Sequence, residues 1–151
     1  MIQNNCSIQS QSYFMNGFLS TITIKDMLIK NVESYSNIFE LSSSNVTISN
    51  MEVSNLSTTK SGQFILLTLD SEMVMTNLSY VDWSMKLIRV YSSKSAILHS
   101  QVMNINTQND QLMNFYLSKD ASITNMTVSN ITSQSSRIID ISYSNANIAD
   151  L

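Results

Sequence analysis

The chain has 151 residues, a length sufficient for one domain with a core. Its formal net charge of −3 has the wrong sign for a nucleic-acid-binding surface. Apolar residues make up 43% of it but charged residues only 13%, so Ser, Thr, Asn and Gln supply most of the polarity. With two glycines and no proline, it lacks the glycine-rich loops that bind phosphates.

One pattern recurs along the chain. The stretch NVTISNMEVSNLS at 45–57 returns in altered form as ASITNMTVSNITS at 121–133. Most copies have an apolar anchor residue followed by apolar residues three and five positions later, although the Ile97 copy has Ser100 at the first of these places. The anchors are 22 to 27 residues apart. The anchors are Ile24, Ile48, Met75, Ile97, Ile123 and Ile148. A period of this length is typical of repeat proteins that stack their units.

A second alternating segment precedes most anchors. In chain order these segments are Phe39–Leu41, Leu67–Leu69, Ile88–Val90, Phe115–Leu117 and Ile139–Ile141. Their outer residues are apolar and the middle residue is usually polar, a period of two that predicts a half-buried strand. We therefore expect three short strands per repeat, separated by turns of Ser, Asn, Asp and Lys, and no helix.

A unit of about 25 residues that contains only strands cannot bury its apolar side chains alone. Stacking successive units as coils buries a continuous apolar column. The sequence therefore predicts an all-β solenoid of about six coils, formed by a single segment, 1–151.

Two polar columns accompany the apolar ones. Because Asn and Asp tolerate left-handed backbone angles, we expect them where the coil bends, with their side chains hydrogen-bonded from coil to coil. The expected structural ladder, two positions after each anchor, is Asp26, Asn50, Asn77, His99, Asn125 and Asp150. The second polar column, five positions further on, is Asn31, Asn55, Asp82, Asn104 and Asn130.

The stretch IFELSSSNVTISNMEVSNLS at 38–57 resembles the parallel β-helix repeat of the pectin-lyase-like superfamily, and the resemblance covers nearly the whole chain. It implies a right-handed parallel β-helix of the kind found in non-enzymatic members. The Asn-, Ser- and Ile-rich composition is also similar to large repeat proteins of ciliates. Leucine-rich repeats are the rival fold, but they need two residues between the last strand residue and the ladder Asn, where Val53 and Asn55 leave one.

Enzymes of that superfamily carry clustered Asp residues, or Asp with Arg or Lys, on outward strand positions. The outward column expected here is Glu40, Thr68, Arg89, Tyr116 and Asp140. Its two acids lie about four coils apart, too far for a catalytic pair. We therefore predict no catalytic residue, no cofactor and no metal site. Asp70, Glu72 and Asp120 lie in turns and are too few to predict a calcium site.

Four single residues have a structural and a functional interpretation. His99, the only histidine, stands in the ladder and is expected to be structural rather than a general base. Tyr80 and Trp83 stand in apolar columns, so we expect them in the core or in a contact patch rather than as an aromatic platform that binds a sugar ring. Cys6 has no second cysteine to pair with and is expected to be a small buried residue.

Asn-x-Ser/Thr triplets give candidate glycosylation sites in a secreted protein. The candidates are Asn5, Asn45, Asn77 and Asn125. Asn55 and Asn130 also begin such triplets, but a ladder amide that faces inward would leave no room for a glycan. A chain rich in Ser, Thr and Asn also produces these triplets by chance.

Both ends fall inside a repeat without a polar cap, so we expect a fragment of a longer chain, or ends that dock on other chains. The apolar runs are too short to span a membrane, and no signal peptide is visible.

The pattern predicts a structural or adhesive scaffold segment in a larger extracellular or cell-surface assembly, without enzymatic activity. Its expected partners are other protein chains or the rest of its own longer chain, with glycans as a further option and no nucleic acid. Two alternatives stay open. One is a non-catalytic or truncated part of a carbohydrate-active lyase or hydrolase, and the other is a glycan-binding module.

Overall fold

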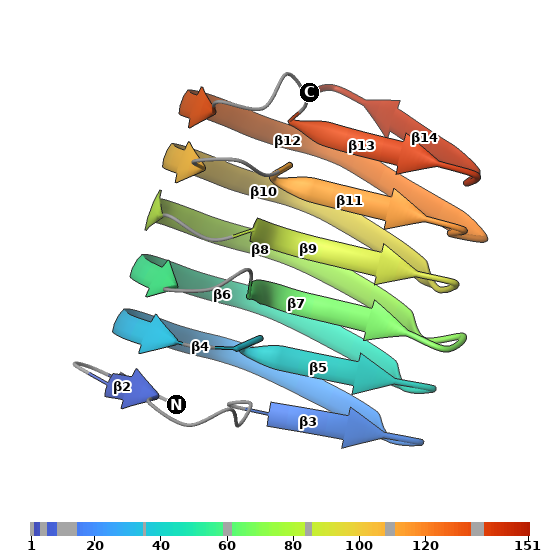
Figure 1. The fold of residues 1–151 in the computed structure, drawn as a ribbon, viewed down its shortest axis with the longest axis horizontal. Helices are drawn as coiled ribbons and strands as arrows, with labels where there is room; N and C mark the ends of the chain where they lie inside the picture. Colours follow the sequence, from blue (N-terminus) through green and yellow to red (C-terminus); the bar gives the residue numbers. More distant parts are fainter. Residues whose placement is uncertain are drawn as a thin grey trace.

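The structure, a computed structural model, describes residues 2–3, 6–8, 15–34, 36–58, 62–83, 86–107, 111–133 and 138–151. Within these ranges every regular element is a β-strand, and the coils stack into a parallel β-helix (Figure 1). The short-strand sheet has six rungs, which correspond to about five full turns. The predicted all-β solenoid is therefore confirmed, with a spacing close to the predicted 25 residues.

Two parallel sheets form the tube. The short-strand sheet contains β3 (Met15–Phe18), β5 (Phe39–Ser42), β7 (Gln63–Thr68), β9 (Lys86–Tyr91), β11 (Met113–Tyr116) and β13 (Ile139–Ser142). The long-strand sheet contains β1 (Ile2–Gln3), β2 (Cys6–Ile8), β4 (Thr21–Ser34), β6 (Asn45–Thr58), β8 (Glu72–Trp83), β10 (Lys94–Thr107), β12 (Asp120–Ser133) and β14 (Ala146–Ala149).

Each complete repeat contains two strands where the sequence predicted three. The anchor strand and the strand after it form one long strand, because pairing with the neighbouring coil resumes on both sides of each bend. In β6 the bends lie at Asn50 and Asn55, whose φ angles are 53° and 54°. A single left-handed residue thus turns the chain without ending the sheet, and the long strands curve behind the short ones (Figure 1).

The anchor residues form one column through the core. Strand pairing places each anchor directly beside the next, from Ile24 to Ile148. Five of the six are buried, and Ile148 on the last rung is 39% exposed. Because each fully buried apolar side chain contributes about 1.5–3 kcal/mol, this column and its inward neighbours stabilise the stack more than any other feature.

Aromatic rings fill the middle of the tube. The ring of Phe64 lies 5.3 Å from that of Phe39 and 5.6 Å from that of Tyr80, measured between centroids. All three side chains are fully buried, and the Tyr80 hydroxyl donates to the carbonyl oxygen of Lys86 at 3.3 Å. Burial raises the pKa of Tyr80 well above its ordinary value, because the phenolate would lose its hydration. Tyr80 is a core residue, whereas the side chain of Trp83 lies outside the described part of the structure.

The structural ladder combines left-handed backbone with side-chain hydrogen bonds. Its six members have φ angles between 50° and 55°. Asn50 Nδ2 donates to Asp26 Oδ1 at 2.9 Å, and Asn77 Nδ2 donates to Asn50 Oδ1 at 3.0 Å. Asn125 Nδ2 lies 3.3 Å from His99 Nδ1, so His99 takes the place of an Asn in the ladder. The predicted asparagine hydrogen bonds are present, and they lie on the solvent side of the bend.

The second polar column has the same chemistry. Asn31, Asn55, Asn104 and Asn130 have φ angles of 52° to 54°. Asn55 Nδ2 donates to Asn31 Oδ1 at 2.7 Å, and Asn130 Nδ2 donates to Asn104 Oδ1 at 3.0 Å. The side chain of Asp82 lies outside the described part of the structure. Each hydrogen bond is worth about 0.5–1.5 kcal/mol at most, so the columns fix the register more than they add stability.

A serine column, buried at its four middle members and missed by the sequence analysis, lines the corner between each short strand and the next long strand. Its members are Ser20, Ser44, Ser71, Ser93, Ser118 and Ser144. The Ser20 N–H donates to Ser44 Oγ, and the Ser44 N–H to Ser71 Oγ, both at 3.2 Å. The Ser44 hydroxyl in turn donates to the Ser42 carbonyl oxygen at 2.8 Å. A serine four residues before most anchors was the available signal, but serine is frequent throughout these turns.

The bend at Asn50 can be separated into backbone and side-chain contributions. Asn50→Gly keeps the left-handed backbone but removes both ladder bonds, and we expect a loss of about 1–2 kcal/mol in the free energy of unfolding. Asn50→Ala also places a Cβ-bearing residue without a polar side chain at positive φ, which should cost about 1–2 kcal/mol more. Urea denaturation measures both losses. Equal losses for the two variants would contradict the role assigned to the backbone angle.

Tyr80 predicts a fall in stability at alkaline pH. Its pKa is higher in the folded chain than in the unfolded chain, so above about pH 10 the unfolded chain releases a proton that the folded chain keeps. The contribution of Tyr80 to the free energy of unfolding is therefore fully present below pH 10, and it falls by about 1.4 kcal/mol per pH unit above that. Tyr80→Phe should flatten the curve of unfolding free energy against pH above 10, and Tyr91→Phe, at an exposed position, is the matched control. Parallel curves for Tyr80→Phe and the wild type would contradict the assignment.

Candidate functional site

The outward column of the short-strand sheet differs from the predicted one. Strand pairing gives the column Glu40, Leu66, Arg89, Asn114 and Asp140. Thr68 and Tyr116 lie two residues further along their strands, in the column of Ser42. The prediction was wrong at these two coils because a period of two looks the same after a shift of two residues.

The acids of this column do not approach each other. Glu40 and Asp140 are four rungs apart, or about 19 Å at the usual strand spacing, whereas the carboxyl groups of glycosidases lie about 5–9.5 Å apart. Each carboxylate is held by a neighbouring amide: Glu40 Oε2 accepts from Asn37 at 2.9 Å, and Asp140 Oδ2 from Asn114 at 3.3 Å. Arg89 is exposed midway between them. Groups arranged in this way hydrogen-bond along the sheet rather than converge on one reacting atom.

The three acids predicted in turns lie beside lysines. Only Asp70 lies in a turn, because Glu72 and Asp120 are the first residues of β8 and β12. Asp70 Oδ1 forms an ion pair with Lys119 Nζ from a turn two coils away. Lys94 lies between Glu72 and Asp120, because it pairs with both in the long-strand sheet. Among the described residues, no group of three or more His, Cys, Asp or Glu side chains is placed to hold a metal ion.

The candidate glycosylation sites differ in their surroundings. Asn45 is exposed at the start of β6, outside both polar columns, and Thr47 of its triplet is exposed as well. Asn77 and Asn125 are also exposed, but the Nδ2 atom to which a glycan would be attached is hydrogen-bonded within the ladder. Asn5 lies outside the described residues. Asn45 is therefore the candidate whose amide does not take part in the ladder.

Asn55 and Asn130 were set aside as glycosylation sites on the expectation that their amides face inward, and the structure does not show this. Their side chains are exposed rather than directed inward. Their Nδ2 atoms donate along the second polar column, so they share the situation of Asn77 and Asn125. The physical reason is that a left-handed residue at a bend carries its side chain toward solvent.

Three tyrosines on successive coils form a strip at the end of the short-strand sheet. The rings of Tyr91 and Tyr116 are stacked, with centroids 5.5 Å apart and planes 16° apart. The ring of Tyr143 meets Tyr116 edge-on at 5.7 Å. Exposed Arg89 lies two residues before Tyr91 and on the same face. Because Tyr91 and Tyr116 stack on each other, the strip offers a ligand apolar ring surface that the stack leaves uncovered, with phenol hydroxyls and Arg89 as polar neighbours.

The sequence analysis considered only Tyr116 of this strip. Tyr91 follows a predicted strand directly, and Tyr143 lies in a turn, so neither stood in a recurring column of the sequence pattern. Their proximity depends on pairing between strands about 25 residues apart.

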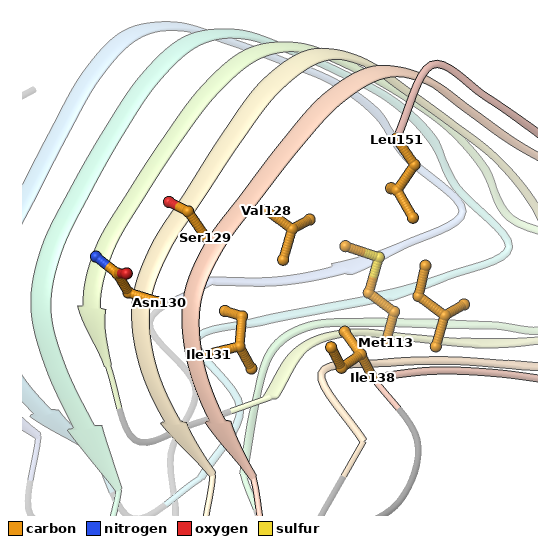
Figure 2. Close-up of a pocket in the computed structure, with 8 residues that line it drawn as sticks. Met113, Val128, Ser129, Asn130, Ile131, Ile138 and Leu151 are labelled. Atoms are coloured by element: carbon orange, nitrogen blue, oxygen red, sulfur yellow. The ribbon is translucent and has the colours of Figure 1, made fainter.

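The core opens at the last rung. A cavity of about 560 Å³ lies there, lined by Met113, Val128, Ile131, Ile138, Ile139 and Leu151 among others. Figure 2 shows the side chains of β12, the end of the chain and the short-strand sheet around this one space. Strands β13 and β14 end the order of described strands in their sheets. The mouth of this cavity is therefore apolar and is bordered by the edges of β13 and β14.

The described part of the chain contains no helix with the length and apolar character needed to cross a membrane.

Comparison of the chain with known proteins finds no matching family model, no matching curated protein and no matching solved structure. Its function must therefore be argued from the fold and from the surfaces described above.

Proposed function

We propose that the chain is a structural or adhesive β-helix segment of a larger extracellular or cell-surface assembly. The observation that carries the proposal is the unbroken linkage of its coils. Strand pairing, the serine column and the asparagine bonds join successive coils on different sides of the tube. A tube linked in this way resists bending and presents dispersed polar groups along its length, which suits a spacer or an adhesive surface.

The resemblance to the pectin-lyase-like superfamily supports the same proposal. The β-helix architecture agrees with that superfamily, and the dispersed outward column agrees with its non-enzymatic members. Exposed Asn45 and Thr47 supply one glycan acceptor that is compatible with an extracellular location. The partners we propose are other protein chains or further coils of a longer chain, which would cover the apolar cavity at the last rung.

The location can be tested directly. An antibody raised against the purified chain should label intact, unpermeabilised cells of the source organism, and external protease should remove the label. An intracellular protein stained in parallel is the control. Labelling that requires permeabilisation would contradict the proposed location. In the same study, incubation with pectic and other polysaccharides should release no new reducing ends or unsaturated products, and release of either would favour an enzyme.

A glycan-binding module is the second candidate function, favoured by the tyrosine strip. Tyr116→Ala removes the middle ring of the stack and should weaken binding to a glycan array by about tenfold or more, since a well-placed aromatic contact contributes about 1.4 kcal/mol. Thr68→Ala, in the same column without a ring, is the matched control. Absence of binding by the wild type, or binding unchanged in Tyr116→Ala, would contradict this function.

A further inference from the structure

The short strands turn into the long strands at the corner on the right-hand side of Figure 1. Exposed apolar side chains gather at this corner. Of the eleven large apolar side chains exposed among the described residues, six lie at this corner. We name them the corner ridge: Phe18, Leu19, Leu69, Tyr91, Leu117 and Tyr143. Four of the others belong to the last coil, so the ridge is the main exposed apolar feature along the length of the tube.

Several ridge residues occupy an unfavourable backbone conformation. Leu19, Leu69, Leu117 and Tyr143 have φ angles of 50° to 53°. At the other left-handed bends that the structure describes, the chain places Asn, Asp or His at such angles. Leu69 and Leu117 were predicted as inward members of short strands, and this was wrong, because both are exposed turn residues. A bulky apolar residue that is both exposed and left-handed does not stabilise the single chain, which points to a role in contact with another molecule.

Large and small residues alternate along the first five members of the left-handed corner column. In chain order its members are Leu19, Ser43, Leu69, Ser92, Leu117 and Tyr143. Leucines on the first, third and fifth coils are thus separated by serines on the second and fourth. The rungs are about 4.8 Å apart, so the leucines form projections about 9.6 Å apart with gaps of similar width between them.

The residue before each of these forms a second column with a different order. Its members are Phe18, Ser42, Thr68, Tyr91, Tyr116 and Ser142, large on the first, fourth and fifth coils and small on the others. When two copies of this column run antiparallel, so that the first coil of one faces the sixth coil of the other, every large residue meets a small one. The corner column reversed in the same way places Leu69 against Ser92 and Leu117 against Ser43, with Leu19 meeting Tyr143 at the ends.

We infer that the corner ridge is the contact surface of an antiparallel two-fold dimer of this chain. In the dimer the third coil faces the fourth coil of the partner copy, and the fifth faces the second. Charge agrees with this arrangement, because exposed Asp70 and Glu72 on the third coil then face exposed Lys94 on the fourth. Interfaces related by a two-fold axis must be self-complementary. In the reversed register the second column meets this requirement at every coil, and the corner column meets it at its four middle coils.

The size of the ridge sets the expected affinity. Six rungs span about 24 Å, which is short for a protein interface, so we expect a weak dimer with a dissociation constant in the micromolar range. The inference goes beyond the scaffold role, because a chain that stays monomeric could still serve as a scaffold. It names the lateral partner that the scaffold role leaves open.

Sedimentation velocity over a range of concentrations tests the dimer. The wild type should dimerise reversibly, and the double variant Leu69→Asn/Leu117→Asn should weaken the dimer at least tenfold. Asn tolerates the left-handed angle, so the thermal midpoint of this variant should not fall, which separates loss of contact from loss of fold. Val74→Asn, at an exposed apolar residue away from the ridge, should leave the dimer unchanged. A wild type that remains monomeric, or a dimer indifferent to the double variant, would overturn the inference.

Two further variants test the orientation. Ser92→Leu fills a gap and should weaken the dimer although it adds apolar surface, whereas stronger association would indicate general stickiness and overturn the inference. In a Cys6→Ser background, a mixture of Leu69→Cys and Ser92→Cys chains should form a disulfide-linked heterodimer under mild oxidation. Linkage between Leu69→Cys chains alone would indicate parallel pairing and contradict the antiparallel arrangement. Flotation of the monomer with phosphatidylcholine vesicles would assign the ridge to a membrane surface instead.

Discussion

Parallel pairing between successive coils is the constraint on which the whole structure depends. A coil can lie flat on its neighbour only if it bends at the same places, and the left-handed bends in the described part of the chain use residues with φ near +50°. At two of the three left-handed columns these residues are Asn, Asp or His, and several of them add a side-chain hydrogen bond to the next coil. The bend therefore serves both the shape of one coil and its alignment with the next.

Stability and alignment come from different groups. The aromatic cluster around Phe64 and every anchor except Ile148 are buried, and these groups supply most of the stabilisation. The asparagine bonds lie on the surface, where water competes for them, and the serine column inside the corner satisfies backbone groups that would otherwise be buried without partners. Loss of a ladder residue should disturb register locally, whereas loss of an anchor weakens two interfaces at once.

The outer surface has few groups that act together chemically but has a distinct lateral edge. Acids on the short-strand sheet are separated by several rungs and held by amides, and the acids predicted in turns lie next to lysines. The corner ridge is the exception to this dispersed polar surface. A stiff tube with one apolar edge and an apolar end can associate both sideways and lengthwise, and both modes agree with the scaffold role proposed for the chain.

The sequence by itself determined the anchor column and the polar columns. The anchors and the polar columns recur at matching positions in copies such as 45–57 and 121–133. A residue type that recurs with the period of the repeat occupies the equivalent position in every stacked coil. The Asn-x-Ser/Thr triplets can also be identified from the sequence alone, because each depends only on neighbouring residues. The sequence likewise shows that no strand carries several acids close together.

Only the tertiary structure decided the register of the short strands and everything built on it. Alternation alone cannot distinguish Leu66 from Thr68, or Asn114 from Tyr116, because side chains two residues apart point to the same side of a strand. Pairing with the neighbouring coils fixes the register of these strands. In this register Leu69 and Leu117 lie at the exposed corner rather than in the expected core. The tyrosine strip and the corner ridge join residues about 25 positions apart. They exist only because backbone hydrogen bonds between coils bring those positions side by side.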